Sequence, residues 1–127
     1  MFTHIMVGTN DPAKAIKFYD ETLGTLGIQG MNMGERAFYR QGEGPALGIG
    51  RPGNGEPATY ANGGTLGFKA SDKAAVDAWH ATGLANGGTD EGAPGKRPNA
   101  PGNAYGAYLR DPDGNKLCVF CELPEGE

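Results

Sequence analysis

The feature of this chain that most constrains its fold is an internal repeat. Two segments show the same order of apolar patterns, and residues at matching places in the two are alike. Early matching pairs are Asp11 and Asp72, Phe18 and Trp79, Leu23 and Leu84, and Gly27 and Gly88. After a longer loop in the second segment, the pairs are Arg40 and Arg110, Gly44 and Gly114, Leu47 and Leu117, and Ile49 and Val119. Such self-similarity predicts one structural unit used twice, in modules of about residues 1–56 and 62–127.

The pattern of the first module predicts a strand, a helix and a hairpin. Residues 2–8 alternate between two faces, which is typical of a strand. Asp11 can cap a helix and Pro12 suits its first turn, and the apolar stripe that follows has helical spacing. The stripe consists of Ala15, Ile16, Tyr19 and Leu23. A hairpin is predicted over residues 36–51, followed by a Gly- and Pro-rich linker over residues 52–64.

The second module repeats this order. Residues 64–70 predict a strand, and the next segment predicts a helix that begins at Ser71 or Asp72. On this helix we expect Trp79 in the core and His80 at the surface.

The end of the chain predicts a long loop and a second hairpin. The loop covers residues 93–103, and the strands cover residues 104–110 and 116–123 around the turn Asp111–Asn115. With a short strand expected after each helix, each module has the order βαβββ. The expected fold is therefore α+β, with two βαβββ modules forming one domain over residues 1–127.

Charge and hydropathy exclude two classes of partner. The chain has a net charge of -4 and a pI near 5.1, whereas a nucleic-acid-binding protein presents a basic face. No segment approaches the roughly 20 apolar residues that cross a bilayer. The N-terminus also lacks the charged and apolar regions of a signal peptide. We expect no nucleic acid, no membrane and a cytoplasmic location.

The two cysteines support the same location. Cys118 and Cys121 lie on one predicted strand, at a spacing that directs their side chains to opposite faces. Their Cα atoms would be ~10 Å apart, which is too far for a disulfide. We expect two reduced thiols, as in a cytoplasmic protein.

Three motifs identify a resemblance to a known superfamily. They are "THIMVGTNDPAKAIKFYDETLG" near the start, "GTLGFKASDKAAVDAWHATGLANGG" at the opening of the second module, and "YLRDPDGNKLCVF" near the end. Together they resemble the vicinal oxygen chelate superfamily, which includes glyoxalase I, bleomycin-resistance proteins and extradiol dioxygenases. The resemblance spans nearly the whole chain and implies a mixed sheet that curls into a cup. It does not specify a reaction, because one fold hosts many functions.

The resemblance also implies where a metal would bind. Metal enzymes of the superfamily place one ligand on each of four strands that face the cup, and by position these sites are His4, Gly48, Thr65 and Cys118. Only His4 is a usual ligand there, and Cys118 stands where a carboxylate is expected. Hard cations prefer oxygen ligands, and catalytic zinc usually has three protein ligands. We therefore expect no cofactor, and the alternative is a divalent ion of nickel, zinc, manganese or iron.

Two of these positions have an alternative catalytic interpretation. His4 is either a packed strand residue or a general base, and Cys118 is either a small buried hydrophobe or a nucleophile beside His4. Thr65 either hydrogen-bonds a ligand or is an ordinary β-branched strand residue. Gly48 lies in a run of alternating small residues, which marks either close approach of a ligand or close packing of the modules.

Aromatic and basic residues of the hairpins are further candidates for ligand binding. They are Tyr39, Arg40, Tyr105 and Arg110. Aromatic rings can stack on a planar ligand and arginine can pair with a carboxylate or phosphate. The alternative is that the aromatics belong to the core and the charges are solvated. Lys96 and Arg97, in the expected loop, could form an anion-attracting lid.

The expected function is a small-molecule-binding protein of the glyoxalase/bleomycin-resistance type without a complete metal site. One alternative is a metal-dependent glyoxalase I-like lyase or dioxygenase, in which the metal acts as a Lewis acid. A second is a metal-independent enzyme that uses His4 and Cys118. The resemblance also implies a homodimer, because small members of the superfamily often complete the cup across two chains, and cyclic dimers are common in general.

Overall fold

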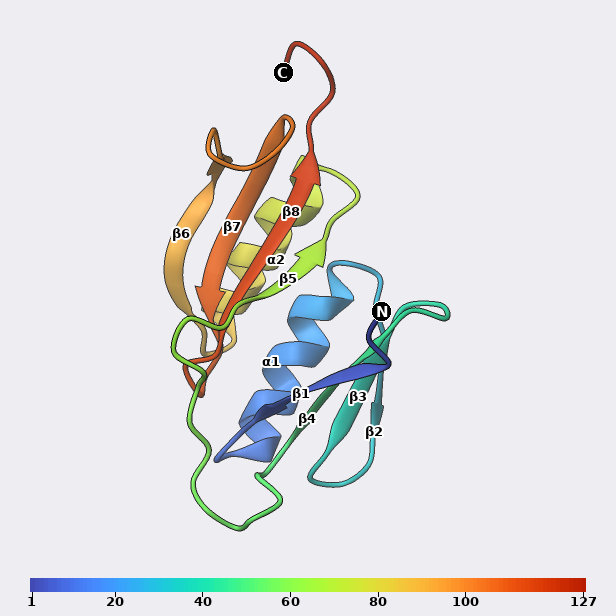
Figure 1. The fold of residues 1–127 in the computed structure, drawn as a ribbon, viewed down its shortest axis with the longest axis vertical. Helices are drawn as coiled ribbons and strands as arrows, with labels where there is room; N and C mark the ends of the chain where they lie inside the picture. The colour runs from blue at the N-terminus through green and yellow to red at the C-terminus, as the bar shows by residue number, and fades with distance from the viewer.

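A computed structural model describes all 127 residues and contains two helices and eight strands (Figure 1). In chain order these are β1 His4–Gly8, α1 Pro12–Gly24, β2 Gly30–Asn32, β3 Ala37–Arg40, β4 Ala46–Gly50, β5 Leu66–Lys69, α2 Lys73–Ala85, β6 Thr89–Lys96, β7 Ala104–Arg110 and β8 Lys116–Glu122. The strands form two sheets in the orders β1-β4-β3-β2 and β5-β8-β7-β6. In each sheet the outer pair that includes the module's first strand is parallel and the other pairs are antiparallel. The predicted α+β class with two βαβββ modules is confirmed.

Both helices begin where the sequence signals placed them. The carboxylate of Asp11 accepts a hydrogen bond from the backbone N–H of Lys14, and Pro12 occupies the first turn of α1. At α2 the cap is Asp72, whose carboxylate accepts from the N–H of Ala75. Each cap satisfies one of the N–H groups that a helix terminus leaves without a partner.

The core lies where the helices pack against the sheets. Figure 1 shows α1 and α2 next to each other, with the sheet of β5 to β8 at the upper left and the sheet of β1 to β4 at the lower right. The largest fully buried side chains include Trp79 and Phe18, a corresponding pair on the two helices. One cluster of buried residues runs through both modules, so the two halves share a core.

The turn between β7 and β8 fastens the second module to the first. A carboxylate oxygen of Asp111 accepts a hydrogen bond of 2.5 Å from the hydroxyl of Tyr19 on α1. The side chain of Asn115 donates to the carbonyl of Gly8, and the N–H of Asn10 donates to Asp113. The turn motif near the end of the chain therefore holds the β1–α1 connection in place.

Two details of the second module differ from the sequence prediction. Strand β6 runs on to Lys96, so it includes the first part of the expected loop over residues 93–103. Two register irregularities in its pairing with β7 accommodate the glycines and Pro94 at this sheet edge. His80, expected at the surface, is buried and its Nε2 lies 2.8 Å from a carboxylate oxygen of Asp90. This partner on β6 explains why an imidazole can be buried there.

Neither helix has the length and the apolar character needed to span a bilayer.

Candidate functional site

The outward face of the first sheet carries a continuous row of side chains. Met6 on β1 is in register with Gly48 on β4, Gly48 with Phe38 on β3, and Phe38 with Met31 on β2. Residues in register across strands direct their side chains to the same face. The neighbouring positions on β3 and β4 are buried in the core shared with the helices, so this row faces away from α1.

Within this row, Met6 and Phe38 close over Gly48. A methyl group built on Gly48 would collide with Sδ of Met6 and lie 2.8 Å from Cε1 of Phe38. Gly48 is buried although it has no side chain, because its two neighbours cover it. The space that a side chain at this position would need is therefore already filled.

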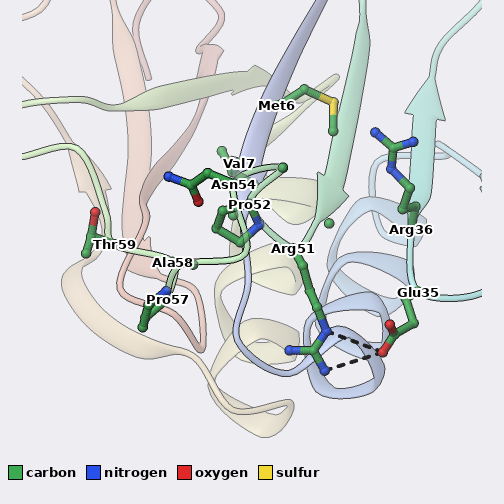
Figure 2. Close-up of a pocket in the computed structure, with 13 residues that line it drawn as sticks. Met6, Val7, Glu35, Arg36, Arg51, Pro52, Asn54, Pro57, Ala58 and Thr59 are labelled. Atoms are coloured by element: carbon green, nitrogen blue, oxygen red, sulfur yellow. Dashed lines mark hydrogen bonds and ion pairs between the residues drawn. The ribbon is translucent and has the colours of Figure 1, made fainter.

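The row ends in an open hollow of about 850 Å³, shown in Figure 2. Its walls come from three parts of the first module: the end of β1, the residues just before β3, and the segment that leaves β4. Met6, Arg36, Arg51 and Asn54 are among the residues that line it. Because these segments are far apart in the sequence, the hollow exists only when the first sheet is assembled.

Asn10 fixes the segment after β4 that forms one wall of the hollow. The side chain of Asn10 accepts a hydrogen bond of 2.7 Å from the N–H of Ala58 and donates one of 3.1 Å to its carbonyl. A methyl group built on Gly8 would lie 3.0 Å from Cβ of Ala58, so glycine allows this close approach. The wall of the hollow is thus held by paired hydrogen bonds, although it belongs to a Gly- and Pro-rich linker.

The two arginines of the hollow differ in their partners. The guanidinium of Arg51 donates to a carboxylate oxygen of Glu35 at 3.3 Å and to the carbonyl of Asn10 at 3.2 Å. Arg36 has no ion pair and no side-chain hydrogen bond. Its guanidinium carbon lies 5.8 Å from the centre of the Phe38 ring, within the range of a cation–π contact.

The outward face of the second sheet has a different row. Gly67 on β5 is in register with Cys118 on β8, Cys118 with Tyr108 on β7, and Tyr108 with Gly92 on β6. A methyl group built on Gly67 would lie 3.2 Å from Sγ of Cys118. The absence of a side chain on β5 thus leaves room for the thiol of Cys118.

The environment of Cys118 is that of a packed thiol. The residue is 8% exposed, and burial raises the pKa of its thiol, although the nearby charge of Lys116 acts in the opposite direction. Cys121, on the opposite face of β8, is also buried and has a raised pKa, chiefly through burial. Both cysteines are unpaired. A raised pKa disfavours the thiolate that a nucleophile or a metal ligand requires.

The structure distributes the predicted catalytic and metal positions over two separate sheets. His4 begins β1 and is exposed, with Nδ1 2.9 Å from the hydroxyl of Thr3, whereas Cys118 is central in the other sheet. Thr65 is exposed and directly precedes β5. Within one chain, therefore, His4 and Cys118 share no strand pair, and the structure shows no hydrogen bond between them.

The predicted aromatic ligand contacts face the helices. The hydroxyl of Tyr39 donates to Asp20 at 2.7 Å, and the hydroxyl of Tyr105 donates to Asp77 at 2.6 Å. This hydrogen bond to Asp77, with a smaller contribution from burial, raises the pKa of Tyr105 to about 12. Both tyrosines are buried, on the faces opposite to Gly48 and Cys118, so they belong to the core.

The predicted arginine contacts lie outside the hollow. Arg40 is exposed at the end of β3. Arg110 donates to Glu91 at 2.9 Å and its guanidinium lies 5.1 Å from the centre of the Tyr60 ring. Lys96, on β6, donates to the carbonyl of Glu127 at the chain end.

The residues present do not fit a metal centre of the kind that the superfamily uses. No group of three or more His, Cys, Asp or Glu side chains converges in the structure. Of the four corresponding positions, Gly48 has no donor and no room for one, and the thiol of Cys118 is packed against Gly67. His4 and Cys118 alone are fewer protein ligands than a catalytic zinc site usually has.

Sequence reasoning missed two residues that line the hollow, Met6 and Arg36. A signal for each was present in the alternation of the strands. Met6 lies two positions after His4 and Arg36 two positions before Phe38, so each shares a strand face with that residue. What the sequence could not supply was the register that places Met6 beside Gly48.

Comparison with known proteins places this geometry in a family. The sequence model of the Glyoxalase/Bleomycin resistance protein/Dioxygenase superfamily matches residues 1–119. A crystal structure of a glyoxalase/bleomycin resistance protein from Albidiferax ferrireducens T118 is 53% identical, covers 96% of this chain and 99% of its own, and superposes with a TM-score of 0.90. No curated protein matches the chain.

More distant structures share the fold. A lactoylglutathione lyase from Agrobacterium tumefaciens is 26% identical, with 95% of this chain and 92% of its own covered and a TM-score of 0.66. A glyoxalase-related enzyme from Fulvimarina pelagi has 19% identity, coverage of 96% and 88%, and a TM-score of 0.78. At this last level of identity the likeness is one of fold alone.

Proposed function

The chain belongs to the Glyoxalase/Bleomycin resistance protein/Dioxygenase superfamily, and we propose that it is a small-molecule-binding protein of that superfamily without a complete metal site. The observation that carries this proposal is the closure of Met6 and Phe38 over Gly48, next to an open hollow of about 850 Å³. The first feature fills a position where metal enzymes of the superfamily place a ligand. The second offers a space in the size range of small-molecule sites.

In this proposal the protein needs no cofactor. Among the four corresponding positions, a nickel, zinc, manganese or iron ion would have only His4 as a usual donor, and burial raises the pKa of the Cys118 thiol, which disfavours the thiolate. The exposed imidazole of His4 is then free to contact a ligand at the edge of the sheet.

We further propose that the protein acts as a homodimer. The outward face of the first sheet exposes large apolar side chains, with Met6 42%, Met31 66% and Met33 56% exposed. A second copy of the chain that covered this face would bury them and would close the hollow on its open side. Met31→Glu would place a charge in that contact, so it is expected to convert a dimer into a monomer in sedimentation velocity. Lys14→Glu, on the helix side, serves as the control.

A metal-dependent lyase is the second candidate function. The solved structure at 26% identity is a lactoylglutathione lyase, and this likeness supports the candidate. The test is turnover of the hemithioacetal of methylglyoxal and glutathione with Ni²⁺ or Zn²⁺ added. Turnover that depends on His4 would favour the lyase, and its absence would favour the binding protein.

The cytoplasm is the location that we propose. The two unpaired, buried thiols of Cys118 and Cys121 support it, because free thiols persist in a reducing compartment.

The experiment that tests the binding function is a fragment screen monitored by NMR of methionine methyl groups. Met6 lines the hollow, whereas Met1 lies at the exposed chain end and reports nonspecific effects. Ligands of the proposed site are expected to shift the Met6 methyl signal saturably and to leave that of Met1 unchanged. A screen in which no compound shifts Met6 would contradict the proposal.

A further inference from the structure

The hollow holds one positively charged side chain whose hydrogen-bond donors are unused. Arg51 is neutralised by Glu35, which is the only carboxylate that lines the hollow. Arg36 has neither an ion pair nor a side-chain hydrogen bond. The hollow therefore has an excess of one positive charge in a chain whose net charge is -4.

The guanidinium of Arg36 is positioned by its neighbours. The Cγ atom of Arg36 would lie 3.3 Å from a methyl group built on Gly50, so the Arg36 side chain packs against a glycine of β4. The ring of Phe38 lies 5.8 Å from the guanidinium carbon. Figure 2 shows the guanidinium on the side of the hollow where Met6 lies, and away from the Arg51–Glu35 pair. Contacts of this kind reduce the rotamer freedom that a surface arginine would lose on binding a ligand.

The rest of the hollow is suited to an apolar group. Met6, Pro52, Pro57 and Ala58 contribute its carbon surface. A planar fork of donors matches a carboxylate in two parallel hydrogen bonds, and a single unpaired arginine matches a single negative charge.

We infer that the hollow selects small organic monocarboxylates, with the carboxylate on Arg36 and the apolar body against Met6 and Pro52. This inference rests on the proposed binding function and adds the chemical class of its ligand.

The test compares two probes of nearly equal shape, benzoate and the uncharged benzamide. Each is titrated into the full-length protein at constant ionic strength, with the Met6 methyl signal as the readout. Benzoate is expected to bind the wild-type protein about tenfold more tightly than benzamide, because a hydrogen bond to a charged group is stronger than one between neutral groups. In Arg36→Gln the advantage of benzoate is expected to disappear. Lys14→Gln removes the same charge from helix α1 and is expected to leave both affinities unchanged.

The failures of the inference and of the proposed function can be distinguished. If benzamide shifts Met6 as strongly as benzoate, and Arg36→Gln changes neither affinity, the carboxylate selection is wrong while binding in the hollow stands. If neither probe shifts Met6, the inference is also wrong, and the wider fragment screen decides on the binding function. If Arg36→Gln instead dissociates a dimer in sedimentation velocity, a carboxylate of a second copy occupies the arginine and the inference is overturned.

Discussion

Gly48 and Cys118 occupy corresponding central strands of the two sheets, but their neighbours are arranged in opposite ways. In the first sheet, Met6 and Phe38 are large and the central residue is glycine. In the second, the neighbour on β5 is Gly67, and the central Cys118 fills the space beside it. The glycine that makes room for its neighbour thus sits on the central strand β4 in the first row and on β5 in the second. The duplicated scaffold has been kept while the residues at its potential ligand positions have diverged.

The two hairpin turns show the same divergence. In the first module, Gln41 begins an exposed turn closed by a backbone hydrogen bond to Gly44. In the second, Asp111 begins a turn with the same backbone bond, to Gly114, but its buried carboxylate also binds Tyr19 of the other module. One turn only reverses the chain, whereas the other also joins the modules.

The largest expected effect comes from removing that carboxylate. Asp111→Ala leaves the hydroxyl of Tyr19, the side-chain amide of Asn115 and two backbone N–H groups of the turn without their acceptor. We expect a loss of about 3 kcal/mol in the free energy of unfolding, measured by urea denaturation. Gln41→Ala at the corresponding turn is expected to change it by less than about 0.5 kcal/mol. Equal losses in the two variants would show that the turns are equivalent.

The effect of Asp111 should also depend on pH. Burial raises the pKa of this carboxyl above its ordinary value, in spite of its hydrogen bonds to Tyr19 and Asn115. The folded state then binds the proton more tightly than the unfolded state, so this contribution to stability falls as the pH rises through the folded-state pKa. The difference between wild type and Asp111→Ala is expected to be larger in mild acid than at pH 8.

A second prediction concerns the two glycines of the rows. Gly48→Ala forces Met6 and Phe38 apart, and we expect it to destabilise the protein by about 1–2 kcal/mol. Gly67→Ala has a nearest neighbour at 3.2 Å, and it also gains the roughly 0.5–1 kcal/mol by which alanine is favoured over glycine in a strand. Its net effect is expected to be close to zero. If thermal denaturation shows Gly48→Ala to be the more stable variant, then Met6 and Phe38 do not close the first row.

A third prediction concerns the reactivity of Cys118. Because burial raises its pKa and leaves the residue only 8% exposed, alkylation by iodoacetamide at pH 8 is expected to be slower than for an unfolded peptide thiol. Peptide mass spectrometry separates its rate from that of Cys121. Rapid alkylation of Cys118 near pH 7 would instead indicate a stabilised thiolate and would support the enzyme that uses His4 and Cys118.

The smallest expected effect lies at His80, which corresponds to Tyr19 on the first helix. Tyr19 binds the other module, whereas His80 binds Asp90 within its own module. The hydrogen bond from His80 is the main cause of the lowered pKa of Asp90. This hydrogen bond therefore stabilises the fold above the ordinary pKa of the Asp90 carboxyl, and the stabilisation is lost as the pH falls through the lowered pKa in the folded state. In His80→Gln, the titration of the Asp90 carboxyl carbon by NMR is expected to move upward. An unchanged midpoint would assign the shift to the N–H of Gly92.

Much of the fold could be predicted from the sequence because its signals are local. The caps Asp11 and Asp72 and the alternation of the strands depend on neighbouring residues. The extension of β6 through Pro94 was not predictable, because register irregularities with β7 compensate for residues that usually mark a loop. The same is true of His80, whose burial depends on a partner ten positions along the chain.

The site was less predictable because it depends on register between strands. Alternation alone separates Tyr39 from Phe38, but it does not say which of the two faces the core, and Tyr39 was predicted as a ligand contact although it is buried. The filling of the Gly48 position by Met6 required knowledge of the pairing of β1 with β4. The hollow required in addition the path of the linker, which a hydrogen-bonded pair between Asn10 and Ala58 defines.

The measurement that tests the central claim most directly is the metal content of the purified protein, combined with thermal-shift titrations of Ni²⁺, Zn²⁺ and Mn²⁺. The protein is prepared free of chelator and affinity tag, as wild type and as His4→Ala. Because Gly48 is covered and Cys118 is packed, we predict no stoichiometric metal and no saturable rise in Tm for either protein. A stoichiometric ion, or a saturable rise that His4→Ala abolishes, would contradict the account and establish a metal centre on this face of the fold.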